Sequence, residues 1–446
     1  MNKKVGFVSL GCAKNLTDTE TMLGILSDRG YDITADVKEA EVIVVNTCAF
    51  IDSAKEESIN AILEMASYKD GACELIVVTG CLAQRYREDI EKELSEVDII
   101  LGTTDYPHIA DALDRYYLEG KKTSQAGDAN SVVDYDLPRI KTTPSYSAYL
   151  KIADGCDNFC TYCIIPKLRG KYKSRPEESI ISEAEKLARS GVKELILIAQ
   201  DTAYYGKDRG EYALHTLLGK LSAIEGIEWI RLQYCYPENI TEDLIREISQ
   251  NPKVVKYIDM PLQHISDNVL KRMGRKSRQS EVESLIDTLR KSNPDIVIRT
   301  SLIVGFPGET EEDFQKLLDF LQKYRLDRVG VFTYSREDGT PAWGFEDQID
   351  EDVKEERRDK AMKLLGEISL SKNREKIGTY AEAIVEGYDE EEFCYVGRTD
   401  KDTPEVDGNA YIYSTRELGA GDIVKIKIID SSEYDVIGEV TDEFTK

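Results

Sequence analysis

"AYLKIADGCDNFCTYC", residues 148–163, joins an apolar run of strand length to three cysteines spaced four and three positions apart. Thiolates are soft ligands that favour iron–sulfur clusters or zinc. A structural zinc site is closed by four ligands, whereas these three cysteines leave one position of a metal centre open. The alternative is a zinc knuckle completed by a distant residue. The spacing predicts that Cys156, Cys160 and Cys163 hold a 4Fe-4S cluster in which one iron is free to bind a small molecule.

Apolar runs alternate with helical patterns on both sides of these cysteines. Six runs of strand length follow one another: "AYLKIADG", "ELILIAQ", "WIRLQYCY", "VKYIDMPLQ", "IVIRTSLIVG" and "VGVFTYS". Six β/α units are two short of a closed eight-fold barrel, so we expect an open or partial barrel with its active site at the C-terminal ends of the strands. The three cysteines follow the first run and therefore lie on that rim.

The N-terminal segment repeats a similar unit. The runs "VGFVSLG", "EVIVVNT", "ELIVVTG" and "VDIILGT" are separated by helical stretches, which predicts a parallel, doubly wound sheet. Two of these helices are predicted to open on capping boxes, Thr17 with Glu20 and Ser53 with Glu56. Residues 121–141 lose the periodicity and gain Gly, Pro, Ser and Thr, which predicts a linker.

A second set of cysteines occupies equivalent positions in this first segment. Cys12, Cys48 and Cys81 each end an apolar run. The ends of parallel strands share one edge of a sheet, where ligand crevices form, so the three thiols can converge. A single cysteine after a strand is usually a small buried core residue without a function. Three cysteines at equivalent strand ends argue against that alternative. We predict a second three-thiolate cluster, again with an open position.

The last part of the chain changes character. A charged helix over roughly residues 350–376 precedes four short strand-like runs with Gly turns, which predict a small β-barrel. The expected domains are therefore 1–120, 142–375 and 376–446, with the linker between the first two.

Composition limits the partners. Nine cysteines, an odd number in clusters, indicate metal or redox chemistry in a reducing compartment, and we expect a cytoplasmic protein. No apolar run approaches the roughly 20 residues of a membrane span, so we expect no membrane association. A net charge of −26 argues against nucleic-acid binding. Residues 377–446 carry 18 acidic and six basic side chains, which favours a basic partner.

The C-x3-C-x2-C spacing at the first strand of a partial barrel resembles the radical S-adenosylmethionine (SAM) enzymes. The resemblance implies that the free iron is chelated by the amino and carboxylate groups of SAM, which is split to a 5′-deoxyadenosyl radical. Matching positions, partly in "IRTSLIVGFPGE" (298–309), imply four SAM contacts: Tyr162, Gln200, Gly305 and Gly308. The two glycines would permit close approach of the adenine or ribose to the backbone. Gln263 and Arg299 lie at strand positions expected to face the same rim and are further candidates.

Two cysteine triads followed by a small barrel are similar, over essentially the whole chain, to the methylthiotransferase branch of that superfamily. The resemblance implies an N-terminal methylthiotransferase domain, a radical SAM core and a TRAM barrel. It also implies two 4Fe-4S clusters, of which the second holds the sulfur to be delivered. One SAM methylates that sulfur, another generates the radical, and flavodoxin or ferredoxin supplies electrons.

Two substrate classes compete within this branch. "SLGCAKNLTDTE" (9–20), "MPLQHISDNVLKRMGR" (260–275) and "DTPEVDGNAYI" (402–412) resemble enzymes that modify an aspartate β-carbon in the twelfth protein of the small ribosomal subunit. The alternative is a tRNA adenosine methylthiotransferase, a group that tends to carry Gln-Met-Asn after the first cysteine. The acidic C-terminal domain agrees with the ribosomal-protein substrate rather than tRNA.

A basic loop, "PKLRGKYKSR" (166–175), follows the first cysteine triad. Alone it could be an RNA patch or a solvated loop. Beside a SAM site, Arg169 and Lys173 are instead candidates to hold a carboxylate of SAM or of the target aspartate.

Overall fold

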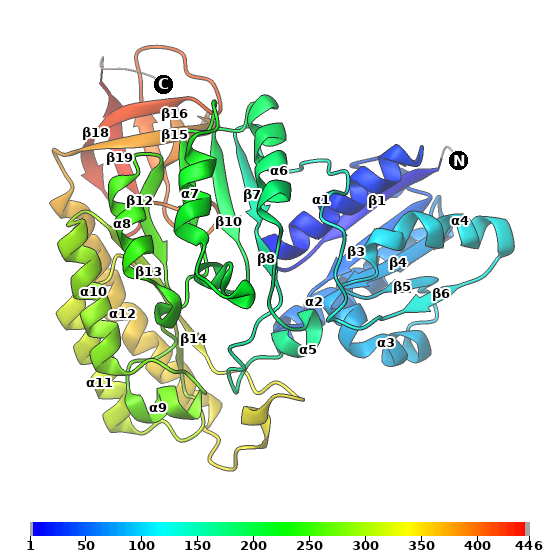
Figure 1. The fold of residues 1–446 in the computed structure, drawn as a ribbon, viewed down its shortest axis with the longest axis horizontal. Helices are drawn as coiled ribbons and strands as arrows, with labels where there is room; N and C mark the ends of the chain where they lie inside the picture. Colours follow the sequence, from blue (N-terminus) through cyan, green and yellow to red (C-terminus); the bar gives the residue numbers. More distant parts are fainter. Residues whose placement is uncertain (1–2, 442–446) are drawn as a thin grey trace.

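Three large sheets follow one another along the chain in the computed structural model, which describes residues 3–441 (Figure 1). The first sheet is parallel throughout, in the order β2-β1-β3-β4-β5-β6. Its strands are β1 (Lys4–Ser9), β2 (Asp32–Ile33), β3 (Val42–Thr47), β4 (Leu75–Gly80), β5 (Ile99–Leu101) and β6 (Thr123–Gln125). Its helices are α1 (Ala13–Asp28), α2 (Asp52–Ala66), α3 (Cys81–Glu93) and α4 (Ile109–Glu119).

Alternating side chains of the central strands bury both faces of this sheet. Val42 and Val44 pack in one cluster with α1 and α4, whereas Ile43 and Val45 pack in another with α2 and α3. The predicted doubly wound sheet is therefore confirmed. The short edge strands β2 and β6 are additions, and β6 lies inside the stretch expected to be a linker. The rest of that stretch, up to residue 146, contains no helix or strand.

The predicted capping boxes are wrong. α1 begins after Cys12 and α2 after Ile51, so Thr17 and Ser53 lie inside their helices. The Thr17 hydroxyl donates to the carbonyl of Lys14 instead. The polar residues that mimic a cap at the start of α1 are buried against the rest of the protein.

The second sheet confirms the open partial barrel. Its six strands are parallel and stand in chain order, β7-β10-β11-β12-β13-β14. They are β7 (Ser147–Lys151), β10 (Glu194–Ile198), β11 (Trp229–Leu232), β12 (Val254–Asp259), β13 (Val297–Val304) and β14 (Arg328–Thr333). Helices that cover the outer face are α6 (Glu177–Arg189), α7 (Leu214–Ser222), α8 (Glu242–Gln250), α10 (Gln279–Ser292), α11 (Glu311–Tyr324) and α12 (Glu351–Glu375).

Small elements complete the rim of this sheet. β8 (Ala153–Asp154) pairs with β9 (Lys173–Ser174), and two short helices, α5 (Ile165–Arg169) and α9 (Asp267–Arg272), lie nearby. The third sheet is a closed barrel, β15-β16-β17-β19-β18. Its strands are β15 (Tyr380–Asp389), β16 (Cys394–Thr399), β17 (Ala410–Tyr413), β18 (Ile423–Ser431) and β19 (Val436–Val440). The strand β16 is an addition to the predicted four.

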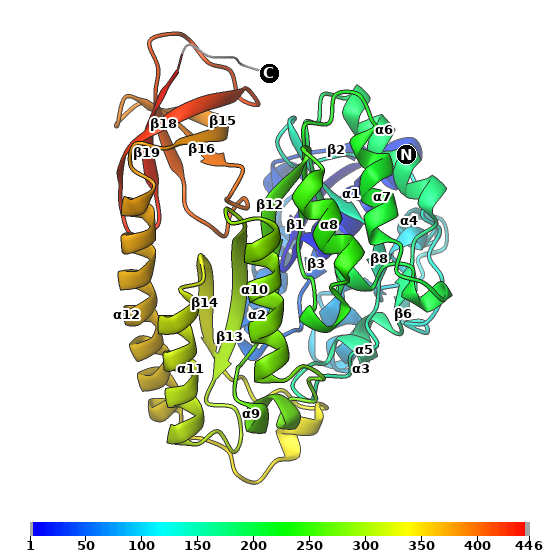
Figure 2. The same cartoon turned by 60° about the vertical axis from the view of Figure 1, so that its left-hand side comes forward.

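The closed barrel caps the end of the second sheet at which its strands begin, drawn uppermost in Figure 2, with α12 running up to it. Ile384 and Ile423 pack against Tyr146, Trp229 and neighbouring aromatic and aliphatic residues at the starts of the strands. The segment 399–407 continues into the interior of the open barrel. There the Gln233 amide donates to the Thr403 hydroxyl at 2.7 Å, and Arg328 pairs with Asp402 at 2.6 Å.

The N-terminal domain closes the other end. Ala13 and Leu16 of α1 pack against Tyr149, Ile196 and Ile198 on the inner face of the second sheet. The ends of the first sheet that carry the cysteines therefore face the rim of the open barrel. No helix within residues 3–441 is long and apolar enough to cross a membrane.

Candidate functional site

The cysteine loop of residues 156–163 is fastened at several points. The Cys156 amide donates to the carbonyl of Gly170 at 3.1 Å, and the Cys163 amide to that of Cys160 at 3.0 Å. Between them, the backbone of Thr161 bonds to Met273 and Ala342, each at 2.9 Å. A loop held by main-chain bonds to three separate segments keeps its thiols in place before a ligand arrives.

The three thiols of this loop lie in a buried setting, and Cys160 acts electrostatically on both of the others. Cys156 and Cys160 are buried and Cys163 is half-buried. Burial raises the pKa of Cys156 to about 12, with smaller contributions from Asp201 and then Cys160. Burial and then Cys160 also raise the pKa of Cys163. A raised pKa keeps such thiols protonated, and binding of a metal centre displaces their protons.

Two of the predicted SAM contacts, one within this loop and one beside it, carry buried polar atoms without a partner. Within residues 3–441, the Tyr162 hydroxyl and the Gln200 side-chain oxygen are buried and accept or donate no hydrogen bond. The Gln200 nitrogen donates to Asp154 at 3.0 Å. Tyr162 packs edge-on to Phe306, with 6.4 Å between the ring centroids. Buried polar atoms without partners are costly, so this edge of the cluster site fits a polar ligand.

The other predicted contacts lie apart from such orphaned atoms. Gln263 has a positive φ of 69° and is joined by its backbone to Ser301 and Ile303 of β13. Arg299 lies inside the barrel, where Asp259 at 2.7 Å and Asp407 at 3.8 Å hold it. Its partners are thus within the chain.

The two glycines of the "GFPGE" turn are packed against protein side chains. A Cβ at Gly305 would meet Lys354, and one at Gly308 would meet the Arg272 guanidinium at 2.6 Å. On this side of the backbone, protein side chains therefore fill the space that was predicted for a ligand. Sequence reasoning missed Glu309, whose carboxylate accepts from the Gly305 amide at 2.7 Å and shapes the turn.

Cys12, Cys48 and Cys81 meet at one edge of the first sheet. They follow β1, β3 and β4, which are neighbours in the sheet. Burial raises the pKa of Cys81 to about 12, and the nearby Cys12 and Cys48 thiols add to this shift. Gly80 has a φ of 91°, and a Cβ there would lie 2.6 Å from the Thr47 carbonyl oxygen. Only glycine therefore lets the two loops approach so closely.

Asn15 ties the loops of this triad together, and sequence reasoning missed it. Its amide nitrogen donates to the carbonyls of Leu10 at 3.1 Å and Thr47 at 2.9 Å. Its oxygen accepts from Arg169 at 2.5 Å and faces the Cys81 sulfur at 3.8 Å. The signal in the sequence was the run of polar residues in "AKNLTDTE", which has no apolar stripe and is almost wholly buried.

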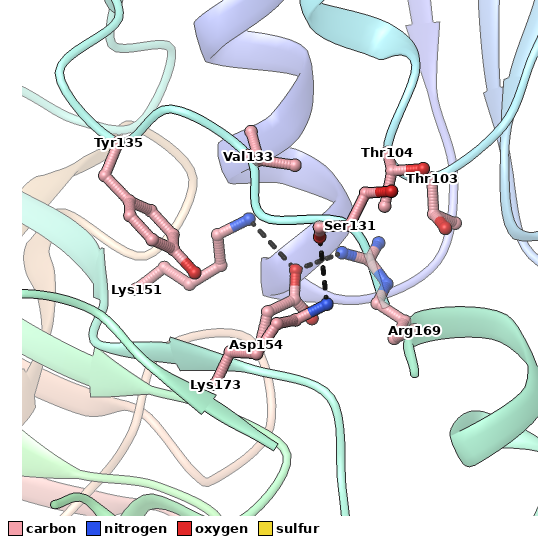
Figure 3. Close-up of a pocket in the computed structure, with 9 residues that line it drawn as sticks. All are labelled: Thr103, Thr104, Ser131, Val133, Tyr135, Lys151, Asp154, Arg169 and Lys173. Atoms are coloured by element: carbon pink, nitrogen blue, oxygen red, sulfur yellow. Dashed lines mark hydrogen bonds and ion pairs between the residues drawn. The ribbon is translucent and has the colours of Figure 1, made fainter. Parts of the chain in front are cut away.

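Arg169 and Lys173 of the basic loop, predicted to bind a carboxylate of SAM or of the target aspartate, have their partners within the chain. Arg169 is buried and pairs with Asp18 at 2.8 Å and Asp154 at 3.2 Å. Lys173 donates to the carbonyl oxygens of Ala129 and Ser131. Figure 3 shows Asp154, Arg169 and Lys173 around a cavity of about 10 Å³, room for at most one water molecule. Arg169 is therefore neither a solvated loop residue nor part of an RNA patch.

The two triads fit iron–sulfur clusters by the chemistry of their donors. Each offers three thiols and no histidine, the ligand set of a 4Fe-4S cluster with an open position. Within residues 3–441, no three His, Cys, Asp or Glu side chains lie close enough to hold a single metal ion. A cubane is wider than one ion, so ligands placed around it stand farther apart.

Three family descriptions match consecutive parts of the chain. "Uncharacterized protein family UPF0004" matches residues 4–102, the Radical SAM superfamily matches 150–321, and the TRAM domain matches 377–441. The chain is 52% identical to "Ribosomal protein uS12 methylthiotransferase RimO" of Acetivibrio thermocellus over 100% of both chains. It is also 52% identical to the protein of that name from Geobacter sulfurreducens, over 98% of both chains.

A solved structure shares much of this fold. The radical SAM methyltransferase TsrM from Kitasatospora setae, with cobalamin and a [4Fe-4S] cluster bound, aligns with a TM-score of 0.57 over 77% of each chain. The sequence identity is 16%, so this likeness concerns the fold alone.

Proposed function

Because the chain belongs to the family of ribosomal protein uS12 methylthiotransferases RimO, we propose that it inserts a methylthio group at the β-carbon of an aspartate in uS12. The observation that carries this proposal is the full-length identity to these relatives, together with two cysteine triads at facing ends of two sheets. The alternative substrate, an adenosine of tRNA, has no such support.

The family also makes this chain a radical SAM enzyme with an iron–sulfur cluster and SAM as cofactors. We propose Cys156, Cys160 and Cys163 as ligands of that cluster. A second 4Fe-4S cluster on Cys12, Cys48 and Cys81 is a further part of the proposal, supported by the convergence of their loops through Asn15. The proposed domains are 1–120, 142–375 and 376–446, in keeping with the ranges of the three family matches.

The chemistry needs a radical because an aliphatic C–H bond offers no acidity and no leaving group. The bound cluster and SAM would supply a 5′-deoxyadenosyl radical that takes the hydrogen atom, so that a C–S bond can form at that carbon. The chain's own residues hold the reactants and exclude water. Tyr162 and Gln200 border the first triad, and Asn15 fixes the loops of the second. Gln263, Arg299, Gly305 and Gly308 remain proposed SAM contacts.

Partners and location follow from the proposed substrate. uS12, free or in the small ribosomal subunit, is the proposed substrate protein, and a flavodoxin or ferredoxin is the proposed electron donor. We propose a cytoplasmic location, where ribosomal proteins are made and thiols stay reduced.

Mass spectrometry of uS12 and of tRNA, from cells with and without this gene, tests the substrate. We expect one methylthio group on an aspartate of uS12 to disappear with the gene, while tRNA is unchanged. Loss of a methylthio group from tRNA alone would replace this proposal by the alternative.

Iron content tests the two clusters. Anaerobically reconstituted protein should hold about eight irons, four for each cubane. Alanine at Cys156, Cys160 and Cys163 should halve the iron and abolish SAM cleavage. Alanine at Cys12, Cys48 and Cys81 should halve the iron but leave 5′-deoxyadenosine formation intact. The matched control is Cys394→Ala, a buried cysteine of neither triad. Full iron loading in either triple variant contradicts the assignment.

A further inference from the structure

One buried cation in this protein lacks an anion. Lys14 lies in the first turn of α1, two residues after Cys12, and only 7% of its surface is exposed. Its ammonium lies 3.2 Å from the ring centroid of Tyr234. Within residues 3–441 it has no hydrogen bond and no ion pair.

The other buried cations show how unusual this is. Every other lysine or arginine that is buried within the described part of the chain forms an ion pair with a carboxylate: Arg169, Arg175, Arg231, Arg275, Arg328, Lys354, Arg357 and Arg398. Taking a charge out of water without a partner is costly, and an aromatic ring compensates only part of that cost. Lys14 therefore lacks a partner that the other buried cations have.

The nearest carboxylates are already engaged. Asp259 accepts from Arg299 at 2.7 Å and from the Tyr234 amide at 3.0 Å. Asp154 pairs with Lys151 and Arg169. Neither is free to serve Lys14, so a carboxylate partner for Lys14 has to come from outside the chain. The group of the chain that most favours its charged form is the Cys12 thiol, itself a proposed cluster ligand.

The position of Lys14 identifies the place where that anion would sit. Lys14 projects from the N-terminal domain onto Tyr234, which follows β11 at the rim of the open barrel. Its neighbour Cys12 is exposed, so molecules in solvent reach this edge. The site thus lies between the second cysteine triad and the barrel rim, where the substrate of the proposed reaction has to enter.

We propose that the Lys14 ammonium binds the side-chain carboxylate of the target aspartate, an inference that rests on the proposed function. The carboxylate carbon of aspartate is bonded directly to the β-carbon. Binding the carboxylate therefore restricts the position of the carbon that reacts. A lysine is a compact point charge with three donors, suited to a carboxylate on a slender side chain. The Tyr234 ring, against which the ammonium packs, restricts the position of the ammonium.

The test is a comparison of two enzymes on two substrates. Reconstituted wild type and Lys14→Met are titrated anaerobically with labelled, unmodified uS12 and with uS12 whose target aspartate is changed to asparagine. Wild type should bind the aspartate form about 10- to 100-fold more tightly, the factor for a charge-assisted hydrogen bond. Lys14→Met should bind both forms equally weakly. Lys14→Arg should keep the preference because it keeps the charge.

The controls separate this inference from its premise. Lys92→Met, which removes an exposed lysine, should behave as wild type. Iron content and 5′-deoxyadenosine formation should be unchanged in Lys14→Met, and if that variant does not fold, Lys14→Gln takes its place. An undiminished preference for aspartate in the variant overturns the role of Lys14. Failure of wild type to bind or modify uS12 overturns the proposed function instead.

Discussion

Asn15 is a single side chain on which the second triad depends, because it joins the loops of Cys12 and Cys48 to Arg169. Replacing it with alanine leaves two carbonyl groups and the guanidinium without this partner, at a cost of about 1–3 kcal/mol. We expect Asn15→Ala to lower the iron content towards four per chain while SAM cleavage persists, measured by iron analysis and 5′-deoxyadenosine assay. Asn60→Ala, an exposed asparagine of α2, should have no effect. Full iron loading in Asn15→Ala would show that the cysteine loops keep their arrangement without Asn15.

β10 joins two domains through one residue, Glu194, which pairs with Arg231 at 3.0 Å and with Arg398 of β16. Breaking such a buried pair costs about 3–5 kcal/mol, so Glu194→Gln should lower the midpoint of thermal unfolding, with Glu185→Gln as an exposed control. Burial alone would raise the pKa of Glu194, but Arg398 and Arg231 hold it below its ordinary value of 4.5. The stabilisation is therefore complete above about pH 4.5 and is lost as the pH falls further. Calorimetry from pH 6 to pH 3 should show this loss in wild type and a flatter curve in Glu194→Gln.

The elements that the sequence predicts well are those with long apolar runs. All six strands of the second sheet and the four central strands of the first were found where β-branched runs indicate them. β2 and β6 were missed because short edge strands carry little pattern. β16, "CYVGRT", is paired on both sides in the closed barrel and was missed because Gly397 and Arg398 interrupt its apolar run. The neighbours of Arg169 and Arg299 could not be predicted, because Asp18 and Asp407 are far away in the sequence and meet them only through the packing of domains. Asn15 was missed for the same reason.

The whole molecule carries a net charge of −26, and this field should speed its encounter with a basic protein. The hairpin after β15 concentrates acids, with Asp389 accepting from the amides of Glu391 and Glu392 and so shaping the turn. Changing Glu390, Glu391 and Glu392 to glutamine, with Asp389 kept, should slow association with uS12 several-fold at low salt and much less at high salt. Stopped-flow fluorescence measures both rates. The matched control neutralises three exposed acids of α2: Glu56, Glu57 and Glu64. Equal slowing by both sets would mean that only net charge matters.

The insertion of the segment 399–407 into the open barrel also governs how the protein is made. Glu194 leaves the ribosome 204 residues before Arg398, the second of its two arginine partners. At about 5–20 residues per second, the nascent barrel waits roughly 10–40 s before this second ion pair can form. Arg328 likewise waits for Asp402. A chain whose translation stops early therefore lacks the interior of its own barrel.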